Sequence, residues 1–175
     1  MSARQPLPFG TYDQRVLPRS RAMRDGYDMD GQIVLPDLVR VIALHRPYAG
    51  LVAAGLKTIE TRGRPWPKAY GPSWLAIYAT ARIDQEAVRH AHPDAAEYIG
   101  PAQALVCMVW IKGSRPLVPE DRDAACFYAP GRWAWELGEV RRFARPVPLA
   151  ETGLKAGPQS VVTVKRDVIL RALGA

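Results

Sequence analysis

The chain has few cysteines and histidines, the residues that bind metals or, as disulfides, stabilise small secreted proteins. Its 175 residues include two cysteines, Cys107 and Cys126, and two cysteines make neither a disulfide framework nor a zinc site. Two of its three histidines, His90 and His92, are two positions apart, so on a helix their side chains point in different directions. No third ligand accompanies them by spacing. We therefore expect no metal site and no cofactor.

The chain also lacks long hydrophobic runs. None approaches the ~20 apolar residues that a membrane-spanning helix needs. Met1 is followed by polar and proline-rich sequence rather than by the apolar segment of a signal peptide. The sequence therefore predicts a soluble, cytoplasmic protein with no membrane partner.

The composition is that of a basic globular protein. Hydrophobic residues make up 48%, which is enough to fill one core, while 16 prolines and 14 glycines predict many turns and short elements. The net charge is +7 and the pI is about 9.7. This charge favours a polyanionic partner such as nucleic acid, but only weakly, because many basic proteins bind none.

Residues 1–38 differ in composition from the rest. They mix Arg15, Arg19, Arg21 and Arg24 with prolines and show no sustained periodicity. We interpret them as a basic, proline-containing N-terminal arm, followed by one domain over residues 39–175. The arginines could clamp a phosphate backbone, or the arm could be solvated or wrapped on the body.

Apolar and alternating runs predict the strands, and amphipathic runs predict the helices. Strands are expected over 39–44, 58–62, 73–81, 102–111, 132–140 and 161–165, and helices over 47–55, 84–92 and 167–173. Many short strands with few interposed helices predict an α+β fold, a small mixed β-barrel flanked by short helices.

Several details of these elements are also predicted. Asp84 and Asp167 are expected to cap their helices. Residues 113–131 are expected to form a long loop, with 120–123 as its solvated tip. The alternating Trp133, Trp135 and Leu137 indicate a core-facing strand.

The segment 55–62 contains three charged residues close together: Lys57, Glu60 and Arg62. The expected strand alternates, so Glu60 and Arg62 share one face, and Lys57 lies in the preceding turn. Such a cluster can hold a polar ligand. Alternatively, it can be a solvated strand face or an ion network without a ligand.

The loop that follows, 63–72, places Arg64, Trp66, Lys68 and Tyr70 between prolines. Basic residues interleaved with aromatic ones are what a surface needs to stack bases and hold phosphates. The alternative is a proline-rich loop whose Trp66 packs against the body. That alternative is preferred for Trp66 alone, and the binding surface is preferred for the whole set.

Three segments together resemble the ASCH domain, the activating signal cointegrator homology domain of the PUA-like superfamily. They are residues 44–52 (LHRPYAGLV), 55–62 (GLKTIETR) and 70–81 (YGPSWLAIYATA), supported by 133–137 (WAWEL) and 145–148 (RPVP). The resemblance spans roughly residues 40–165. Its most specific element is the Gly-x-Lys-x-x-Glu-x-Arg motif.

The resemblance implies a β-barrel flanked by helices, with Lys57, Glu60 and Arg62 lining a cleft on one side. Members bind nucleic acid, some cleave RNA, and one branch hydrolyses acylated cytidine nucleosides. That branch has a threonine nucleophile where this chain has Glu60, so the hydroxyl that would form an acyl intermediate is missing. Arg46 and Tyr48 replace the family's usual glutamine and tryptophan, which keeps an aromatic ring and adds a positive charge.

The favoured hypothesis is a nucleic-acid-binding module for RNA or single strands, with RNA preferred over DNA and a nucleotide as a further candidate ligand. Its binding candidates are Arg46, Tyr48, Lys57, Glu60, Arg62, Arg64, Trp66 and Lys68. The alternative is a hydrolase acting on RNA, as a metal-independent ribonuclease, or on a modified nucleoside, with Lys57 and Glu60 as its catalytic acid/base pair. A purely structural ion network ranks third. The sequence leaves the oligomeric state open.

Overall fold

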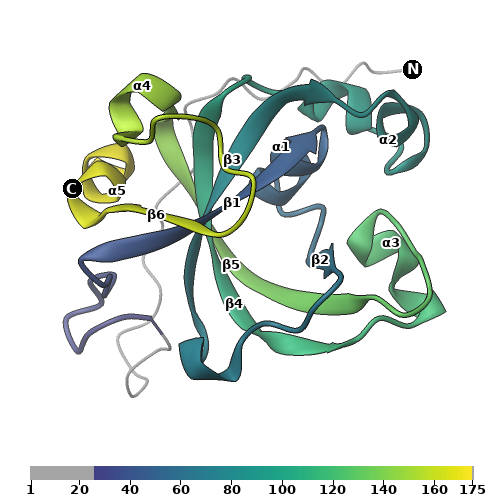
Figure 1. Cartoon of the computed structure of the whole chain (residues 1–175), viewed down its shortest axis with the longest axis horizontal. Coiled ribbons are helices and arrows are strands. Elements are labelled where there is room, and N and C mark those ends of the chain that lie inside the picture. Colours follow the sequence, from purple (N-terminus) through teal and green to yellow (C-terminus); the bar gives the residue numbers. More distant parts are fainter. Residues whose placement is uncertain (1–25, 175) are drawn as a thin grey trace, which may run out of the picture.

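The computed structural model describes residues 26–174, so Arg15, Arg19, Arg21 and Arg24 lie outside the described part (Figure 1). The strands are β1 (Leu38–Arg46), β2 (Ile59–Arg62), β3 (Ser73–Ile83), β4 (Ala104–Pro116), β5 (Trp133–Pro148) and β6 (Val162–Lys165). The helices are α1 (Tyr48–Ala53), α2 (Gln85–His90), α3 (Arg122–Ala125), α4 (Leu149–Thr152) and α5 (Arg166–Leu173). Three short 3-10 turns are η1 (Lys68–Tyr70), η2 (Ala95–Tyr98) and η3 (Pro119–Asp121).

The six strands form one sheet in the order β2-β5-β4-β3-β1-β6. β1 runs parallel to β3, and the other neighbours are antiparallel. The predicted mixture of strands and short helices is confirmed. The predicted barrel is not, because within residues 26–174 the backbone pairing ends at β2 on one side and at β6 on the other, leaving the sheet open.

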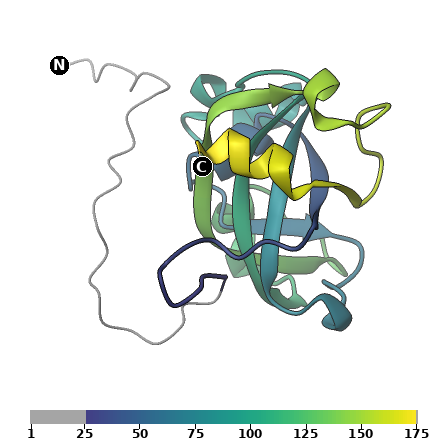
Figure 2. The ribbon, with the colours of Figure 1, turned by 90° about the vertical axis from the view of Figure 1, so that its left-hand side faces the viewer.

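Hydrophobic cores cover both faces of the sheet. On one face Val168 and Ile169 of α5 join Val39 and Val41 of β1, and Figure 2 shows α5 lying across that face. On the other face α1 packs against the sheet in a cluster that includes Ile42 and Leu44 of β1. The central strands are therefore apolar on both faces, as buried strands are. Among the described residues, no helix is both long and apolar enough to span a bilayer.

The described part of the predicted N-terminal arm packs onto the sheet. Tyr27 and Leu35 are buried in the same core cluster as α5. Gly26 has a φ of +89°, and a Cβ at this position would lie 2.6 Å from the Trp74 and Trp110 rings. The Trp74 Nε1 group also donates to the Gly26 oxygen at 3.1 Å. Residues 26–37 thus contribute to the core of the domain that was predicted to begin at residue 39.

The predicted strands and helices are present, with two kinds of correction. Asp84 caps α2 by accepting from the Ala87 N–H at 3.0 Å, as predicted, whereas α5 begins after Lys165 with Asp167 in its first turn. β4 extends beyond its predicted end, so the loop predicted over 113–131 is shorter and contains η3 and α3, and β5 continues beyond residue 140 to Pro148. Cross-strand pairing between β4 and β5 outweighs the local turn signals there.

The predicted solvated tip at residues 120–123 is also corrected at one position. Asp121 is buried, and both of its carboxylate oxygens accept from Arg115, at 2.6 and 2.7 Å. It also accepts from the Val118 N–H at 3.0 Å. Hydrogen bonding to Arg115 lowers the Asp121 pKa below its usual range. This carboxylate therefore fastens η3 to the end of β4.

Candidate nucleic-acid interface

The turn that carries the motif is fixed by backbone hydrogen bonds. Gly55, with a φ of +75°, ends the α1 segment in the left-handed region that glycine adopts without strain. The N–H groups of Leu56 and Lys57 then donate to the Leu51 oxygen at 2.9 and 3.1 Å. The Thr58 N–H donates to the Ala124 oxygen of α3 at 2.9 Å. α1, β2 and α3 thus hold Lys57 in one place.

Lys57 is buried, with 3% of its surface exposed. Its Nζ donates to the backbone oxygens of Ile59 at 2.6 Å and Ala125 at 2.5 Å. It also forms an ion pair with Glu60 Oε2 at 3.4 Å. The Lys57 charge is therefore held by two backbone oxygens and one carboxylate.

Glu60 lies between two cations. Its side chain pairs with Lys57 on one side, and its Oε1 lies 3.0 Å from Arg62 Nε on the other. Glu60 is 7% exposed, whereas about a third of the Arg62 side chain is exposed. Arg62 also donates from Nη2 to the Ala43 oxygen at 3.3 Å, which links β2 to β1. The structure therefore brings the three motif side chains together as one ion cluster.

Tyr48 flanks this cluster. The Lys57 Nζ lies 5.5 Å from the centroid of the Tyr48 ring. Burial, together with the nearby negative groups of Asp84, Cys126 and Glu60, raises the pKa of Tyr48 to about 12. Burial also raises the pKa of the Cys126 thiol, while the Lys57 charge opposes that shift. No spacing in the sequence indicated that Cys126 or Asp84 would lie near the motif.

Trp66 is buried, with 4% of its surface exposed, so it belongs to the core as the alternative interpretation expected. Its Nε1 group donates to the Gly71 oxygen at 2.7 Å, and its ring contacts Trp135 with centroids 4.9 Å apart. In turn, Trp135 donates to the Arg64 oxygen at 2.9 Å. Trp66 thus holds the loop on the sheet, and its ring is not available for base stacking in this conformation.

The remaining predicted residues differ in their surroundings. Arg64 and Lys68 are exposed, and neither has a carboxylate partner within residues 26–174. Arg46 donates to the Ala81 oxygen at 2.5 Å and to the Gly100 oxygen at 3.4 Å. In the described part of the chain, no hydrogen bond or ion pair joins Arg46 to the ion cluster. Arg46 therefore holds the end of β1 instead.

A second cation–aromatic contact was not predicted from the sequence. The Arg40 guanidinium carbon lies 3.7 Å from the centroid of the Tyr70 ring. Tyr70 also contacts Trp66, with ring centroids 5.3 Å apart. The sequence did contain a signal, because Arg40 is the one cation in the otherwise apolar run from Val39 to Leu44.

Positive charge is concentrated in one part of the chain. From Leu38 to Ile83 there is one acidic residue, Glu60, against seven basic ones: Arg40, Arg46, Lys57, Arg62, Arg64, Lys68 and Arg82. This segment has a charge of +6, compared with +7 for the whole chain. It includes β1, β2, the loop 63–72 and β3.

The fold has solved relatives. An ASCH protein from Zymomonas mobilis is 18% identical, with a TM-score of 0.50 over 77% of this chain and 93% of that one. A tyrosine-to-phenylalanine mutant of the Zymomonas mobilis protein is 16% identical, with a TM-score of 0.50 over 77% of this chain and 96% of the other. The chain has the fold of an ASCH domain. No protein-family model and no curated protein matches its sequence.

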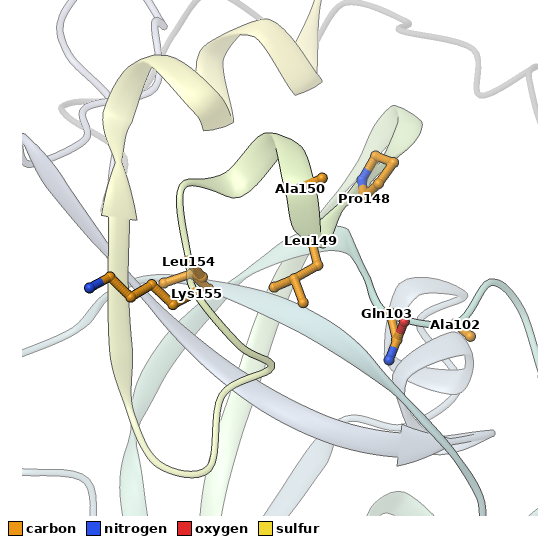
Figure 3. A pocket seen from close by; sticks show the side chains of 7 residues that line it. All are labelled: Ala102, Gln103, Pro148, Leu149, Ala150, Leu154 and Lys155. Atoms are coloured by element: carbon orange, nitrogen blue, oxygen red, sulfur yellow. The ribbon is translucent and has the colours of Figure 1, made fainter.

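The structure also has a surface hollow of about 470 Å³ beside α4 (Figure 3). It is lined by Ala102, Gln103, Pro148, Leu149, Ala150, Leu154 and Lys155, none of which belongs to the predicted site. Lys155 is its single charged lining residue. Between residues 26 and 174, no three His, Cys, Asp or Glu side chains lie close enough together to share a metal ion.

Proposed function

We propose that this ASCH domain binds nucleic acid, RNA or a single strand, through a basic surface formed by Arg62, Arg64 and Lys68. The observation that carries the proposal is the charge of the segment 38–83, seven cations against one acid, with Arg64 and Lys68 exposed and without carboxylate partners in the described chain. An unpaired cation that contacts a phosphate releases a condensed counterion from the nucleic acid, and this release favours binding. Arg64 and Lys68 can contribute to the binding free energy in this way without first breaking an ion pair.

Buried side chains hold the residues of this surface in position. Lys57 and Glu60 connect α1, α3 and β2, and Glu60 orients Arg62 through their ion pair. Trp66 and Trp135 hold the loop that carries Arg64 and Lys68. We assign these side chains a positioning role, since side chains fixed in advance lose less freedom when the ligand binds.

The second candidate function is hydrolysis of RNA or of a modified nucleoside. It is favoured by the gathering of Tyr48, Lys57, Glu60 and Cys126 at one place. However, a general base needs a free lone pair within reach of the substrate. The Lys57 ammonium is buried, donates to two backbone oxygens and pairs with the Glu60 carboxylate. Binding therefore ranks above catalysis.

Nucleic-acid binding and RNA hydrolysis are tested together by incubating the protein with labelled short RNA, single-stranded DNA and duplex DNA at low salt with a chelator. A native gel reports complexes, and a denaturing gel reports cleavage. The proposal expects a complex with intact RNA or single-stranded DNA. Shortened RNA would favour the hydrolase, and the absence of any complex with all three would overturn the binding function.

A further inference from the structure

We propose that Arg40 and Tyr70 form a stacking shelf for one unpaired base of a single-stranded nucleic acid. This inference rests on the proposed function and adds to it a site for the base, whereas Arg62, Arg64 and Lys68 would contact phosphates. No base-binding role follows for these two residues from the motif, because neither belongs to it.

The contact between the two side chains is close. The Arg40 guanidinium carbon lies 3.7 Å from the Tyr70 ring centroid, which places the cation over the face of the ring. The buried Trp66 holds Tyr70 from another side, with an angle of 72° between the two ring planes. Tyr70 is nevertheless 38% exposed. The ring is thus fixed in position while part of it faces solvent.

Contacts continue from this shelf to the ion cluster. The Trp66 ring touches Tyr70 on one side and Trp135 on the other. The Arg62 guanidinium carbon lies 5.6 Å from the Trp135 ring centroid. Cations and rings therefore follow one another from Arg40 to Arg62. The two tryptophans in the middle of the row are buried, so a bound strand would stack a base at the Arg40–Tyr70 end and place a phosphate at the Arg62 end.

Arg40 is suited to a ligand rather than to an internal ion pair. Within residues 26–174 no carboxylate pairs with it, and the other residues from Val39 to Leu44 are apolar. Guanidinium planes and aromatic rings both stack on nucleic-acid bases, and the stacking tolerates every base because each one has a π-face. Bases inside a duplex are already stacked on both sides. The shelf therefore selects single strands without selecting a sequence.

The test compares an oligouridylate of about eight nucleotides with an abasic oligomer of the same length and charge, for wild type, Tyr70→Leu and Tyr70→Phe. We expect wild type to bind the oligouridylate about tenfold more tightly than the abasic oligomer. Tyr70→Leu should lose this preference, whereas Tyr70→Phe should keep it. Because leucine removes no charge, the dependence of affinity on salt should be unchanged in Tyr70→Leu.

Thermal unfolding of the three proteins confirms that each is folded at the assay temperature. Equal binding of both oligomers by wild type, or a Tyr70→Leu variant that keeps the preference, would overturn the shelf and leave the phosphate-binding function standing. If wild type binds neither oligomer, both proposals are wrong. These outcomes separate the failure of the shelf from the failure of the function.

Discussion

Arg62 reaches from β2 to β1, where its Nη2 donates to the backbone oxygen of Ala43 at 3.3 Å. β2 and β1 are not paired with each other in the sheet. The Arg62 side chain therefore links two strands that no backbone hydrogen bonds connect. The same guanidinium lies 3.0 Å from Glu60. A change in Arg62 should therefore affect both the sheet edge and the ion cluster.

The Arg62→Gln variant is predicted to lower the free energy of unfolding by about 1–2 kcal/mol, since it removes one hydrogen bond and one ion pair. The amides of β2 should then exchange hydrogen faster. Arg64→Gln is the control, because this exposed neighbour has no carboxylate partner in the described chain and should change stability by less than about 0.5 kcal/mol. Equal stabilities of the two variants would contradict the bridging role.

Lys57→Met should be far more destabilising than a change at a surface lysine. It leaves Glu60 with a single cation and leaves two backbone oxygens without their donor, so we expect a loss of about 3–5 kcal/mol, measured by urea unfolding. Lys68→Met is the matched control, and it should reduce nucleic-acid affinity while leaving stability nearly unchanged. A fully stable Lys57→Met variant would show that the cluster does not hold the turn.

The Tyr48 phenol should make stability fall at alkaline pH. Its pKa is about 12 in the folded protein and about 10 when unfolded, so the stabilisation is complete below about pH 10 and is lost as pH rises towards 12. Tyr48→Phe should weaken this dependence. Within residues 26–174 the hydroxyl has no hydrogen-bond partner, so the variant should keep its stability at neutral pH. Urea unfolding between about pH 8 and 11 measures the difference, and identical profiles would refute it.

Asp121→Asn should destabilise the fold by about 1–3 kcal/mol, because Asp121 accepts three hydrogen bonds near the end of β4. The folded pKa is lowered, so this stabilisation is present above about pH 4 and is lost as pH falls through the lowered value. Glu151→Gln is the control, because its partner Arg145 and the carboxylate are both exposed and such pairs contribute little. Similar melting temperatures for the two variants would contradict the assignment.

The sequence predicted the elements whose signals are local. Alternation and apolar runs located the strands, and Asp84 and Gly55 located helix boundaries. The motif spacing also placed Lys57, Glu60 and Arg62 together, because residues in one turn and one short strand are held by local geometry.

What the sequence could not predict depends on partners distant in the chain. Asp121 was expected in a solvated tip because its partner Arg115 comes from the extended end of β4. The Arg40–Tyr70 contact joins residues that only the fold brings together. Similarly, whether the sheet closes into a barrel depends on which strands pair, and the residue pattern of a single strand does not determine its partner.

The most direct test of the proposed function is the salt dependence of RNA binding by wild type, Arg64→Gln/Lys68→Gln and Lys155→Gln. Fluorescence anisotropy with a labelled single-stranded RNA, over about 50–200 mM salt, gives the slope of log affinity against log salt. We predict a steep slope for wild type and for Lys155→Gln, whose substitution lies beside α4. Each phosphate that Arg64 or Lys68 neutralises in the wild type contributes about 0.7 to the slope. The slope of the double variant should be shallower by that amount for each phosphate contact it has lost. A double variant with the wild-type slope and affinity would contradict the proposal that these residues form the interface.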